Sequence, residues 1–574
     1  MQRKIIIKDP PEEKALQQLI AESKSKNPII ASLLLQRGIN SYEEAKSFFR
    51  PSPDHLHNPF LMQDMDKAVA RLSLALKNKE NILVYGDYDV DGTSSVALVY
   101  SFLKNEYCAK VDYYIPDRYT EGYGISFDGI DYAARNKQTL VIALDCGIKA
   151  VEKMEYASEK KIDFIICDHH TPGEYLPKAL AVLDPKRNDC NYPDKNLSGC
   201  GVGFKLLQAL CERENTAFDS LLQYLDFVAI SIASDIVPII GENRILAYHG
   251  LKKLNENPTP GLSGLLQLQS IKGKKMNISD CVFKIGPRIN AAGRIKSGKY
   301  AVELLVSKNT EIANDFALQI DQYNTQRRSI EQGITEEALQ MIAQNEQSNS
   351  QRSTVLYNEK WHKGIIGIVA SRLIETHYKP TIILTKSDEY ITGSARSVVG
   401  FDLYSAIENS AHLLKNFGGH KYAAGLTLHP ENLEQFRQEF ESYVTEHITP
   451  EQMRPVLTVD AELNLGDIDA KFYNALRQMA PFGPANMTPV FLTKHLRDTG
   501  RSQKVGKDQT HLKLEVTDED NNIFEGIAFS AAPAYYDLIH VQKKRFSLCY
   551  TIDLNEFKGT KKLQLLVKEI YVEN

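Results

Sequence analysis

The chain has 574 residues, of which 43% are hydrophobic and 25% are charged, and its formal net charge is −5. This length predicts three or four domains, and the composition is ordinary for a soluble globular protein. The net charge gives no overall attraction to nucleic acid. A polyanionic partner would therefore have to bind at local basic patches or through bound metal.

The cysteines and the apolar runs indicate the compartment. Eight cysteines are scattered singly without a CxxC pair, which fits a reducing cytosol and argues against a disulfide framework or structural zinc. No apolar run is long enough to cross a bilayer. We therefore expect a cytoplasmic protein that does not associate with a membrane.

The first half of the chain is predicted to contain two domains. Residues 1–79 show apolar residues at helical spacing in three stretches, with prolines between them, and are expected to form an N-terminal helical cap. Residues 80–245 alternate short apolar strands with helices. This alternation is typical of a doubly wound α/β domain with a parallel sheet.

The second half is predicted to contain three further regions. Residues 246–350 form a helical linker region with a long connecting helix over 300–344, interrupted near Gly333. Residues 351–448 contain three strand-like runs and are expected to form a second α/β domain. Residues 449–574 carry five strand-like stretches, which suit a C-terminal β-barrel such as an OB-fold, although the count alone also fits other β modules.

Acidic and histidine side chains follow four apolar runs of the 80–245 region. Three of the runs are continuous and rich in β-branched residues, and predict parallel strands whose carboxyl ends share one edge of a sheet. All of the acidic side chains are expected at that edge, where their mutual repulsion calls for a divalent cation. The side chains are Asp87, Asp89, Asp91, Asp145, Asp168, His169, His170 and, after the fourth run, Asp235.

Each of these clusters has another interpretation when it is taken alone. The GDYDVDG segment around Asp89 also suits a solvated acidic turn or a calcium loop, but an EF-hand needs a preceding helix and a later bidentate Glu. Adjacent histidines are more often structural than ligands, and the position of His169 and His170 after a strand favours a ligand. Cys146 and Cys167, beside ligand positions, are expected to face the core.

The ligand types predict the chemistry. Carboxylates with one or two imidazoles favour Mn²⁺, because Mg²⁺ prefers oxygen ligands and zinc prefers sulfur and nitrogen. Two ions roughly 4 Å apart that share a carboxylate would activate water for in-line attack on phosphorus, so phosphoester hydrolysis is predicted. The chain has neither a GxSxG nor a GxxxxGK[ST] motif, so nothing indicates a serine nucleophile or a nucleotide-driven motor.

Several motifs resemble a known family. GDYDVDG, ALDCGI, CDHH and ASDIVP resemble the four motifs of the DHH phosphoesterase superfamily, and GGHKYAAG resembles the GGH motif of the DHH-associated domain. FKIGPRINAAGR, WHKGIIGIVASRL, GSARS and PFGPANMTPVF resemble the RecJ family of single-strand-specific exonucleases, over essentially the whole chain. The resemblance implies hydrolysis of single-stranded DNA from the 5′ end to 5′-mononucleotides, with two Mn²⁺ or Mg²⁺ ions, in DNA repair and recombination. Candidate partners are a helicase and a single-strand-binding protein, and a monomer is expected.

The resemblance also implies roles for the acidic and histidine residues. Asp89 and Asp145 would hold one metal ion with Asp87 nearby, and Asp145 would bridge to the second ion. The other ligands of the second ion would be Asp91, His169 and Asp235. His170 would face the scissile phosphate or orient the ligands, and Asp168 would fix an imidazole tautomer without binding metal itself.

Phosphate contacts are expected from a second group of residues. Gly418 and Gly419 would let backbone N–H groups approach an anion and His420 would donate to phosphate, although a glycine turn that caps the preceding helix is an alternative. Guanidinium groups match phosphate geometry. The further candidates are Arg294, His362, Ser394 and Arg396, and the family match suggests that Arg396 and Ser394 capture the 5′-terminal phosphate.

Basic and aromatic residues are interleaved in the C-terminal region. They suit a positive groove with stacking surfaces for single strands, and equally a set of solvated turns with core aromatics. The aromatics are Phe491, Phe529 and Phe546, and the basic residues are Lys494, Arg497, Arg501, Lys504, Lys507, Lys543, Lys544 and Arg545.

Two other functions compete with a single-strand exonuclease. A DHH phosphodiesterase that acts on short oligoribonucleotides or other small phosphoesters typically lacks the helical cap and the barrel expected here. A non-catalytic DNA-binding replication scaffold should show broken motifs, whereas all four metal-site motifs are intact in this chain.

Overall fold

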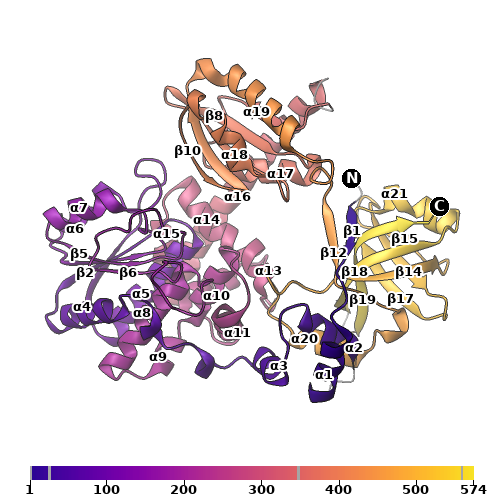
Figure 1. Ribbon diagram of the computed structural model, residues 1–574, viewed down its shortest axis with the longest axis horizontal. Helices are drawn as coiled ribbons and strands as arrows, with labels where there is room; N and C mark the ends of the chain where they lie inside the picture. The colour runs from indigo at the N-terminus through magenta and orange to yellow at the C-terminus, as the bar shows by residue number, and fades with distance from the viewer. Residues whose placement is uncertain (1–2, 24–26, 346–349, 558–559, 574) are drawn as a thin grey trace. The chain divides into compact units, whose positions relative to one another are not determined.

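The computed structural model describes residues 3–23, 27–345, 350–557 and 560–573 (Figure 1). These residues form two units. One unit contains residues 50–328 together with the short segment 480–487, and the other contains residues 1–49, 329–479 and 488–574. Each unit is described by itself.

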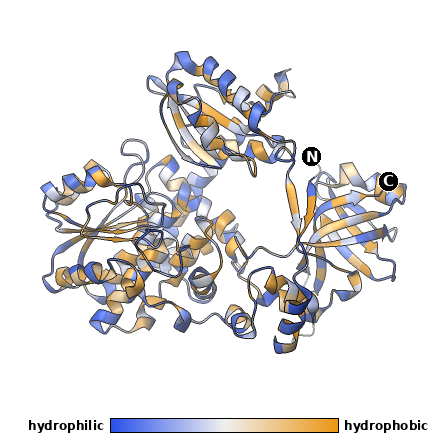
Figure 2. Cartoon of the chain, viewed as in Figure 1, coloured by the Kyte–Doolittle hydropathy of each residue, from blue (hydrophilic) through white to orange (hydrophobic). Residues whose placement is uncertain are grey.

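A parallel sheet organises the first unit, and its central strands are the predicted apolar runs. The strand order is β3-β2-β4-β5-β6, and every neighbouring pair is parallel. After the first residue of β2 and of β5, the central strands contain no charged or amide side chain (Figure 2), because both faces of the sheet are buried. The strands are β2 (Asn81–Gly86), β3 (Lys110–Tyr114), β4 (Leu140–Leu144), β5 (Asp163–Cys167) and β6 (Ala181–Leu183).

Helices cover both faces of this sheet. Alternate residues of β4 contribute to different cores, with Ile142 on one face and Val141 on the other. The first core includes side chains of α4 (Met65–Lys77), α5 (Val90–Glu106) and α8 (Gly199–Glu214), and the second includes those of α6 (Phe127–Arg135) and α7 (Val151–Glu159). This arrangement confirms the predicted doubly wound domain. Cys146 and Cys167 are buried in these cores, as expected.

Further helices complete the first unit. They are α9 (Phe218–Leu222), α10 (Leu225–Ser234), α11 (Gly241–Glu256), α12 (Pro260–Leu266), α13 (Ile278–Asp280), α14 (Gly286–Ile295) and α15 (Lys299–Leu305), with short turns η1 (Pro53–His55), η2 (Pro59–Leu61) and η3 (Cys281–Ile285). Within the described ranges, no helix is both long and apolar enough to span a bilayer.

The predicted connecting helix is present, but its break lies elsewhere. The structure has α15 and then α16 (Thr310–Gln344), separated by residues 306–309, and α16 runs through Gly333 without interruption. A Cβ atom at Gly333 would meet no atom within 4 Å. A single glycine costs about 1 kcal/mol relative to Ala in a helix, which the other residues of a long helix offset.

A mixed sheet organises the central part of the second unit, with strand order β10-β11-β9-β8-β7. Only β7 and β8 are parallel, and the other neighbouring strands are antiparallel. Helix α17 packs against β8 and β9, whereas α19 contributes Phe436 and Phe440 to the core on the other face. The elements are β7 (Thr354–Tyr357), α17 (Ile366–His377), β8 (Thr381–Ser387), β9 (Tyr390–Arg396), α18 (Leu403–Glu408), η4 (Ala411–Leu413), β10 (Leu414–His420), β11 (Ala423–Leu428), η5 (Pro430–Asn432) and α19 (Leu433–His447).

The C-terminal strands form a closed barrel. The sheet order is β13-β14-β18-β19-β17-β16-β15, and an additional pairing of β14 with β16 closes five of these strands into a ring. The predicted OB-like barrel is therefore present. The elements are β13 (Ala461–Glu462), η6 (Leu465–Asp467), α20 (Ala470–Gln478), β14 (Phe491–Asp498), β15 (Gln503–Val505), β16 (His511–Thr517), β17 (Ile523–Ala528), α21 (Ala532–Tyr536), η7 (Asp537–Val541), β18 (Phe546–Phe557) and β19 (Thr560–Val572).

The N-terminal segment differs from the predicted single cap over residues 1–79. Strand β1 (Lys4–Ile7) pairs in parallel with β12 (Val456–Val459), more than 400 residues later in the chain. Helices α1 (Glu13–Ser23), α2 (Pro28–Leu35) and α3 (Tyr42–Phe49) belong to the same unit as the barrel, whereas α4 belongs to the first unit. Residues 1–79 are thus divided between the two units.

Candidate metal centre and phosphate-binding residues

The GDYDVDG segment is a tight turn between β2 and α5. Strand β2 ends at Gly86, and Asp89 is the N-cap of α5, where its Oδ1 accepts a hydrogen bond from Gly92 N at 3.0 Å. A Cβ atom at Gly92 would lie 2.4 Å from Asp87 O, so only glycine fits there. The chain therefore turns at these three aspartates instead of continuing as a strand.

The carboxylate of Asp91 is fixed by the start of α8. It accepts hydrogen bonds from Gly199 N at 2.7 Å, Cys200 N at 2.8 Å and Ser231 Oγ at 2.7 Å. The first N–H groups of a helix lack intrahelical partners and carry partial positive charge, which stabilises an anion there. Gly199 is also required sterically, because its Cβ would lie 2.6 Å from the Cβ of Asp145.

Three aspartates surround the ring of His169. The His169 Nε2 atom lies 3.2 Å from Asp145 Oδ1, 3.5 Å from Asp235 Oδ2 and 3.7 Å from Asp91 Oδ2. Asp145 follows β4 and has a left-handed backbone with φ of 59°, and His169 follows β5. Asp235 follows α10, so the fourth apolar run, for which no strand was predicted, forms a helix and is not part of the sheet.

Four buried polar atoms of this cluster lack hydrogen-bond partners among the described residues. Both ring nitrogens of His169, Oδ1 of Asp145 and Oδ1 of Asp87 are buried and make no hydrogen bond among the described residues. Burial, with the charges of Asp91 and Asp89, raises the pKa of Asp145 well above its usual value and that of Asp235 to about 8. Unpaired carboxylates around a bare imidazole fit a divalent cation, in agreement with the prediction of a metal site.

Asp168 and His170 form a hydrogen-bonded pair beside the cluster. Asp168 Oδ1 lies 2.7 Å from His170 Nδ1, and Oδ2 accepts from Ile148 N at 2.9 Å. Burial acts to raise the pKa of Asp168, but these hydrogen bonds and the histidine charges outweigh it and lower the pKa to about 2. Asp168 is therefore a carboxylate that orients the His170 ring.

Two further side chains near the cluster were not predicted. The hydroxyl of Tyr123 donates to Asp145 O at 3.1 Å and lies 3.2 Å from His170 Nε2. The guanidinium of Arg118 lies 3.9 Å from the ring centroid of Tyr88. Burial and the charge of Asp89 raise the pKa of Asp87 well above its usual value, and the charge of Arg118 acts in the opposite direction. Tyr123 and Arg118 come from the irregular connection between β3 and α6, where the sequence has no periodic pattern.

Arg294 also belongs to this unit. It lies on α14, and its carbonyl accepts a hydrogen bond from the hydroxyl of Tyr119 at 2.5 Å. Burial, with the positive charge of Arg118, lowers the pKa of Arg294 to about 10. The guanidinium of Arg294, close to the charge of Arg118, is suited to binding an anion, which is the role expected for Arg294.

Ser394 and Arg396 lie together on β9 in the second unit, beside the start of α17. Arg396 Nη1 donates to Ser394 Oγ at 3.1 Å, and a Cβ atom at Gly367 would lie 2.7 Å from that Oγ and 3.1 Å from Arg396 Nη2. His362 precedes this helix and accepts a hydrogen bond from Gly364 N at 3.1 Å through Nδ1. A helix N-terminus beside a half-buried arginine is a site suited to phosphate.

The GGH residues form part of a hairpin and do not cap a helix. In the sheet register Gly418 pairs with Gly425 and Gly425 with Ser394, so all three share the face that carries Arg396. His420 is on the same face, and a Cβ atom at Gly418 would meet nothing within 4 Å. Gly419, on the opposite face, has φ of 147° and no room for a Cβ. The hairpin thus presents backbone without side chains at Gly418 and Gly425, next to Arg396. The alternative interpretation, a glycine turn that caps the preceding helix, is wrong.

The barrel only partly supports the predicted stacking groove. Phe491 and Phe546 are fully buried in the core, whereas Phe529 is 62% exposed. Several of the basic residues are paired with acidic ones, including Lys494 with Glu462 and Lys543 with Asp498. Of the three aromatics, Phe529 alone presents its ring for stacking.

The sequence matches known families over most of its length. Residues 81–232 match the DHH family N-terminal domain, residues 350–446 the DHHA1 domain and residues 459–569 the RecJ OB domain. The chain is 35% identical over 549 residues to the single-stranded-DNA-specific exonuclease RecJ of Bacillus subtilis, covering 95% of this chain and 68% of that protein. It is 32% identical over 562 residues to the RecJ of Escherichia coli, covering 95% and 96%.

A solved structure has the same fold. The crystal structure of RecJ from Thermus thermophilus in complex with Mn²⁺ aligns with a TM-score of 0.84 at 23% identity, over 100% of this chain and 80% of that one. The chain therefore belongs to the RecJ family of single-stranded-DNA-specific exonucleases.

Proposed function

We propose that the protein hydrolyses single-stranded DNA from the 5′ end and releases 5′-mononucleotides, using two Mn²⁺ or Mg²⁺ ions. The observation that carries the proposal is the buried cluster of carboxylates around the unpaired His169 Nε2 atom. The relative from Thermus thermophilus was solved in complex with Mn²⁺. The resemblance also supports a cytoplasmic monomer that acts in repair and recombination with a helicase and a single-strand-binding protein.

The side-chain oxygen and nitrogen atoms that keep a free lone pair support the ligand assignment. Asp91 Oδ2 accepts one hydrogen bond, keeps a second lone pair and lies 3.7 Å from His169 Nε2. We assign Asp91, Asp145, His169 and Asp235 to one ion. Asp89 and Asp145 would hold the other, with Asp87 beside it. Bound divalent ions would stabilise the negative charge that develops on the phosphate oxygens and lower the pKa of a water molecule.

The surrounding residues would position the substrate and hold protons. His170 is kept in one orientation by Asp168 on Nδ1 and faces the Tyr123 hydroxyl on Nε2, so it is placed to contact the scissile phosphate. Burial acts to lower the pKa of His170, but the bond to Asp168 raises it, and a protonated imidazole would favour phosphate. Arg294 would add a second positive contact.

The decisive experiment follows the label from each end of a single strand. The full-length protein with Mn²⁺ should release labelled mononucleotide at once from a 5′-labelled oligonucleotide. From a 3′-labelled one, it should release label only after the rest of the strand. Blunt duplex should persist. Release in the opposite order would refute the polarity, and preference for short RNA over DNA strands would favour the phosphodiesterase alternative.

The preference for the 5′ end of the DNA strand is proposed to depend on Arg396. Replacing Arg396 with Gln should lower kcat/KM for a 5′-phosphorylated strand by about 10- to 100-fold, the loss of a charge-assisted hydrogen bond worth about 1.5–3 kcal/mol. The rate on a 5′-hydroxyl strand should change much less. Arg437→Gln, on α19 in the same unit, serves as the charge-matched control. Equal losses on both strands would contradict a role in binding the terminal phosphate.

A further inference from the structure

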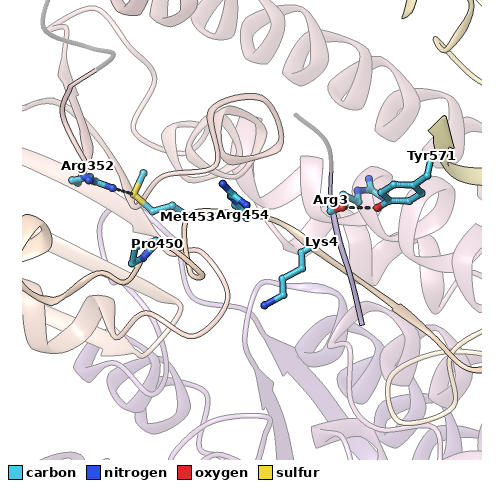
Figure 3. Close-up of a pocket in the computed structure, with 7 residues that line it drawn as sticks. All are labelled: Arg3, Lys4, Arg352, Pro450, Met453, Arg454 and Tyr571. Atoms are coloured by element: carbon cyan, nitrogen blue, oxygen red, sulfur yellow. Dashed lines mark hydrogen bonds between the residues drawn. The ribbon is translucent and has the colours of Figure 1, made fainter. Parts of the chain in front are cut away.

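A cavity of about 620 Å³ in the second unit is lined by positive charge and contains no acidic residue in its wall. Its residues come from β1, the start of β7, the connection from α19 to β12 and the end of β19. Figure 3 shows Lys4 and Arg454 between the Arg352 and Met453 pair and the Arg3 and Tyr571 pair. The lining residues are Arg3, Lys4, Arg352, Pro450, Met453, Arg454 and Tyr571.

The backbone around this cavity is held by hydrogen bonds. Lys4 N donates to Pro455 O at 2.9 Å, and the hydroxyl of Tyr571 donates to Arg3 O at 2.5 Å. Arg352 N donates to Glu441 Oε1 at 2.7 Å. The cationic side chains therefore project from fixed positions, although the side chains themselves are exposed.

Nearby carboxylates do not neutralise the cavity. Glu441 accepts hydrogen bonds from Arg352 N, Ser353 N and Ser353 Oγ, so it is bound to backbone and hydroxyl groups instead of a guanidinium. In the described part of the chain, no carboxylate forms an ion pair with Lys4, Arg352 or Arg454, and Arg3 Nε lies 3.9 Å from Glu569.

One exposed carboxylate offsets part of the charge. The pKa of Glu451 is lowered by hydrogen bonds to its own N–H and to Thr449, and to a lesser degree by the charges of Lys4 and Arg454. Four cations against this carboxylate and Glu569, which pairs with Arg3 at 3.9 Å, leave a positive excess, in a chain whose net charge is −5. Such an excess attracts anions from solution.

We propose that this cavity binds phosphate groups of single-stranded DNA, as a contact separate from both the metal cluster and the Arg396 face. Three guanidinium groups and a lysine in one wall suit phosphodiester oxygens, and Tyr571 and Met453 offer surface to a sugar or base. The volume exceeds that of a lone phosphate and falls in the range of about 300–1,000 Å³ typical of ligand sites. The choice of DNA as the polyanion rests on the proposed function.

The test is the salt dependence of strand binding. A 30-nucleotide thymidine strand with phosphorothioate linkages, labelled at its 3′ end, is titrated by fluorescence anisotropy with the full-length protein and Mn²⁺ at several salt concentrations. In the double variant Arg352→Gln/Arg454→Gln, the slope of log K against log salt should fall by about 1.4, since each phosphate contact on a single strand contributes about 0.7. The control Lys14→Gln/Lys471→Gln removes two exposed lysines of the same unit and should leave the slope unchanged.

The outcomes separate this proposal from its alternatives. An unchanged slope in the arginine variant, or an equal fall in the lysine control, overturns the proposal. Thymidine monophosphate and inorganic phosphate are added as competitors, and both should displace the strand only at millimolar concentration. Micromolar competition by the mononucleotide would make the occupant a free nucleotide and overturn the assignment to a strand. Absence of mononucleotide release by the native protein would refute the proposed function. The salt slopes are measured independently of hydrolysis, so they would still decide whether the cavity binds the strand.

Discussion

The variant Asp145→Asn should lose hydrolysis almost completely and yet be more heat-stable than the native protein when both are free of metal. Asp145 contacts His169 and is the carboxylate assigned to both ions. Removal of a metal contact worth several kcal/mol lowers kcat by about 10³-fold or more. The melting temperature should rise, because the amide removes a buried carboxylate that Asp91, Asp89 and Asp235 repel.

The matched control for this variant is Asp226→Asn. Asp226 is equally buried in the same unit, where burial raises its pKa to about 6, and it accepts hydrogen bonds from Thr259 N at 2.7 Å and Phe227 N at 3.1 Å. It is outside the metal cluster, so its variant should keep the native rate of mononucleotide release. Native activity in Asp145→Asn, or a similar loss in both variants, would contradict the assignment of Asp145.

Divalent metal should stabilise the native protein, and more strongly at pH 8 than at pH 6. In the metal-free state the pKa of Asp235 is raised from its ordinary value of 3.8 to about 8, because of burial and the charges of Asp91 and Asp89. A raised pKa in the folded state gives stability that is present below about pH 4 and is lost as pH rises toward 8. Metal binds the ionised carboxylates and displaces their protons, so its stabilisation grows over the same interval.

Thermal unfolding with and without Mn²⁺ measures this effect. An ion at about 100 times its Kd stabilises the folded state by about 2.7 kcal/mol. The difference in melting temperature between samples with and without Mn²⁺ cancels the contributions of all titrating groups that metal does not affect. The shift should be small and nearly independent of pH in Asp145→Asn. A shift in the native protein that is equal at pH 6 and pH 8 would show that metal does not replace protons at this cluster.

The central sheet could be predicted because its strands are buried on both faces, which produces continuous apolar runs such as the one before Asp145. The run before Asp235 is just as apolar but forms α10, a helix buried on all sides. Periodicity cannot distinguish a strand from a helix when every side chain is buried. The position of Asp235 was nevertheless correct, since the end of α10 reaches the same cluster.

Other features depend on contacts between distant parts of the chain. Strand β1 forms by pairing with β12. No local pattern around its three isoleucines indicates that they pair with a strand so much later in the chain. Gly199 is required by its distance to Asp145, and Tyr123 is placed by an irregular connection. Asp168 could be identified from sequence as a residue that orients an imidazole, whereas Gly199 and Tyr123 could not be identified.

The left-handed backbone at Asp145 has a consequence for how this architecture diversifies. Asn and Asp adopt this conformation far more readily than branched or bulky residues do, so the exchange of one for the other hardly disturbs the turn after β4. A single base change in the gene could therefore silence cleavage while the fold and its DNA-contacting surfaces survive. A single tolerated substitution is thus sufficient to produce a related protein that binds single strands without hydrolysing them.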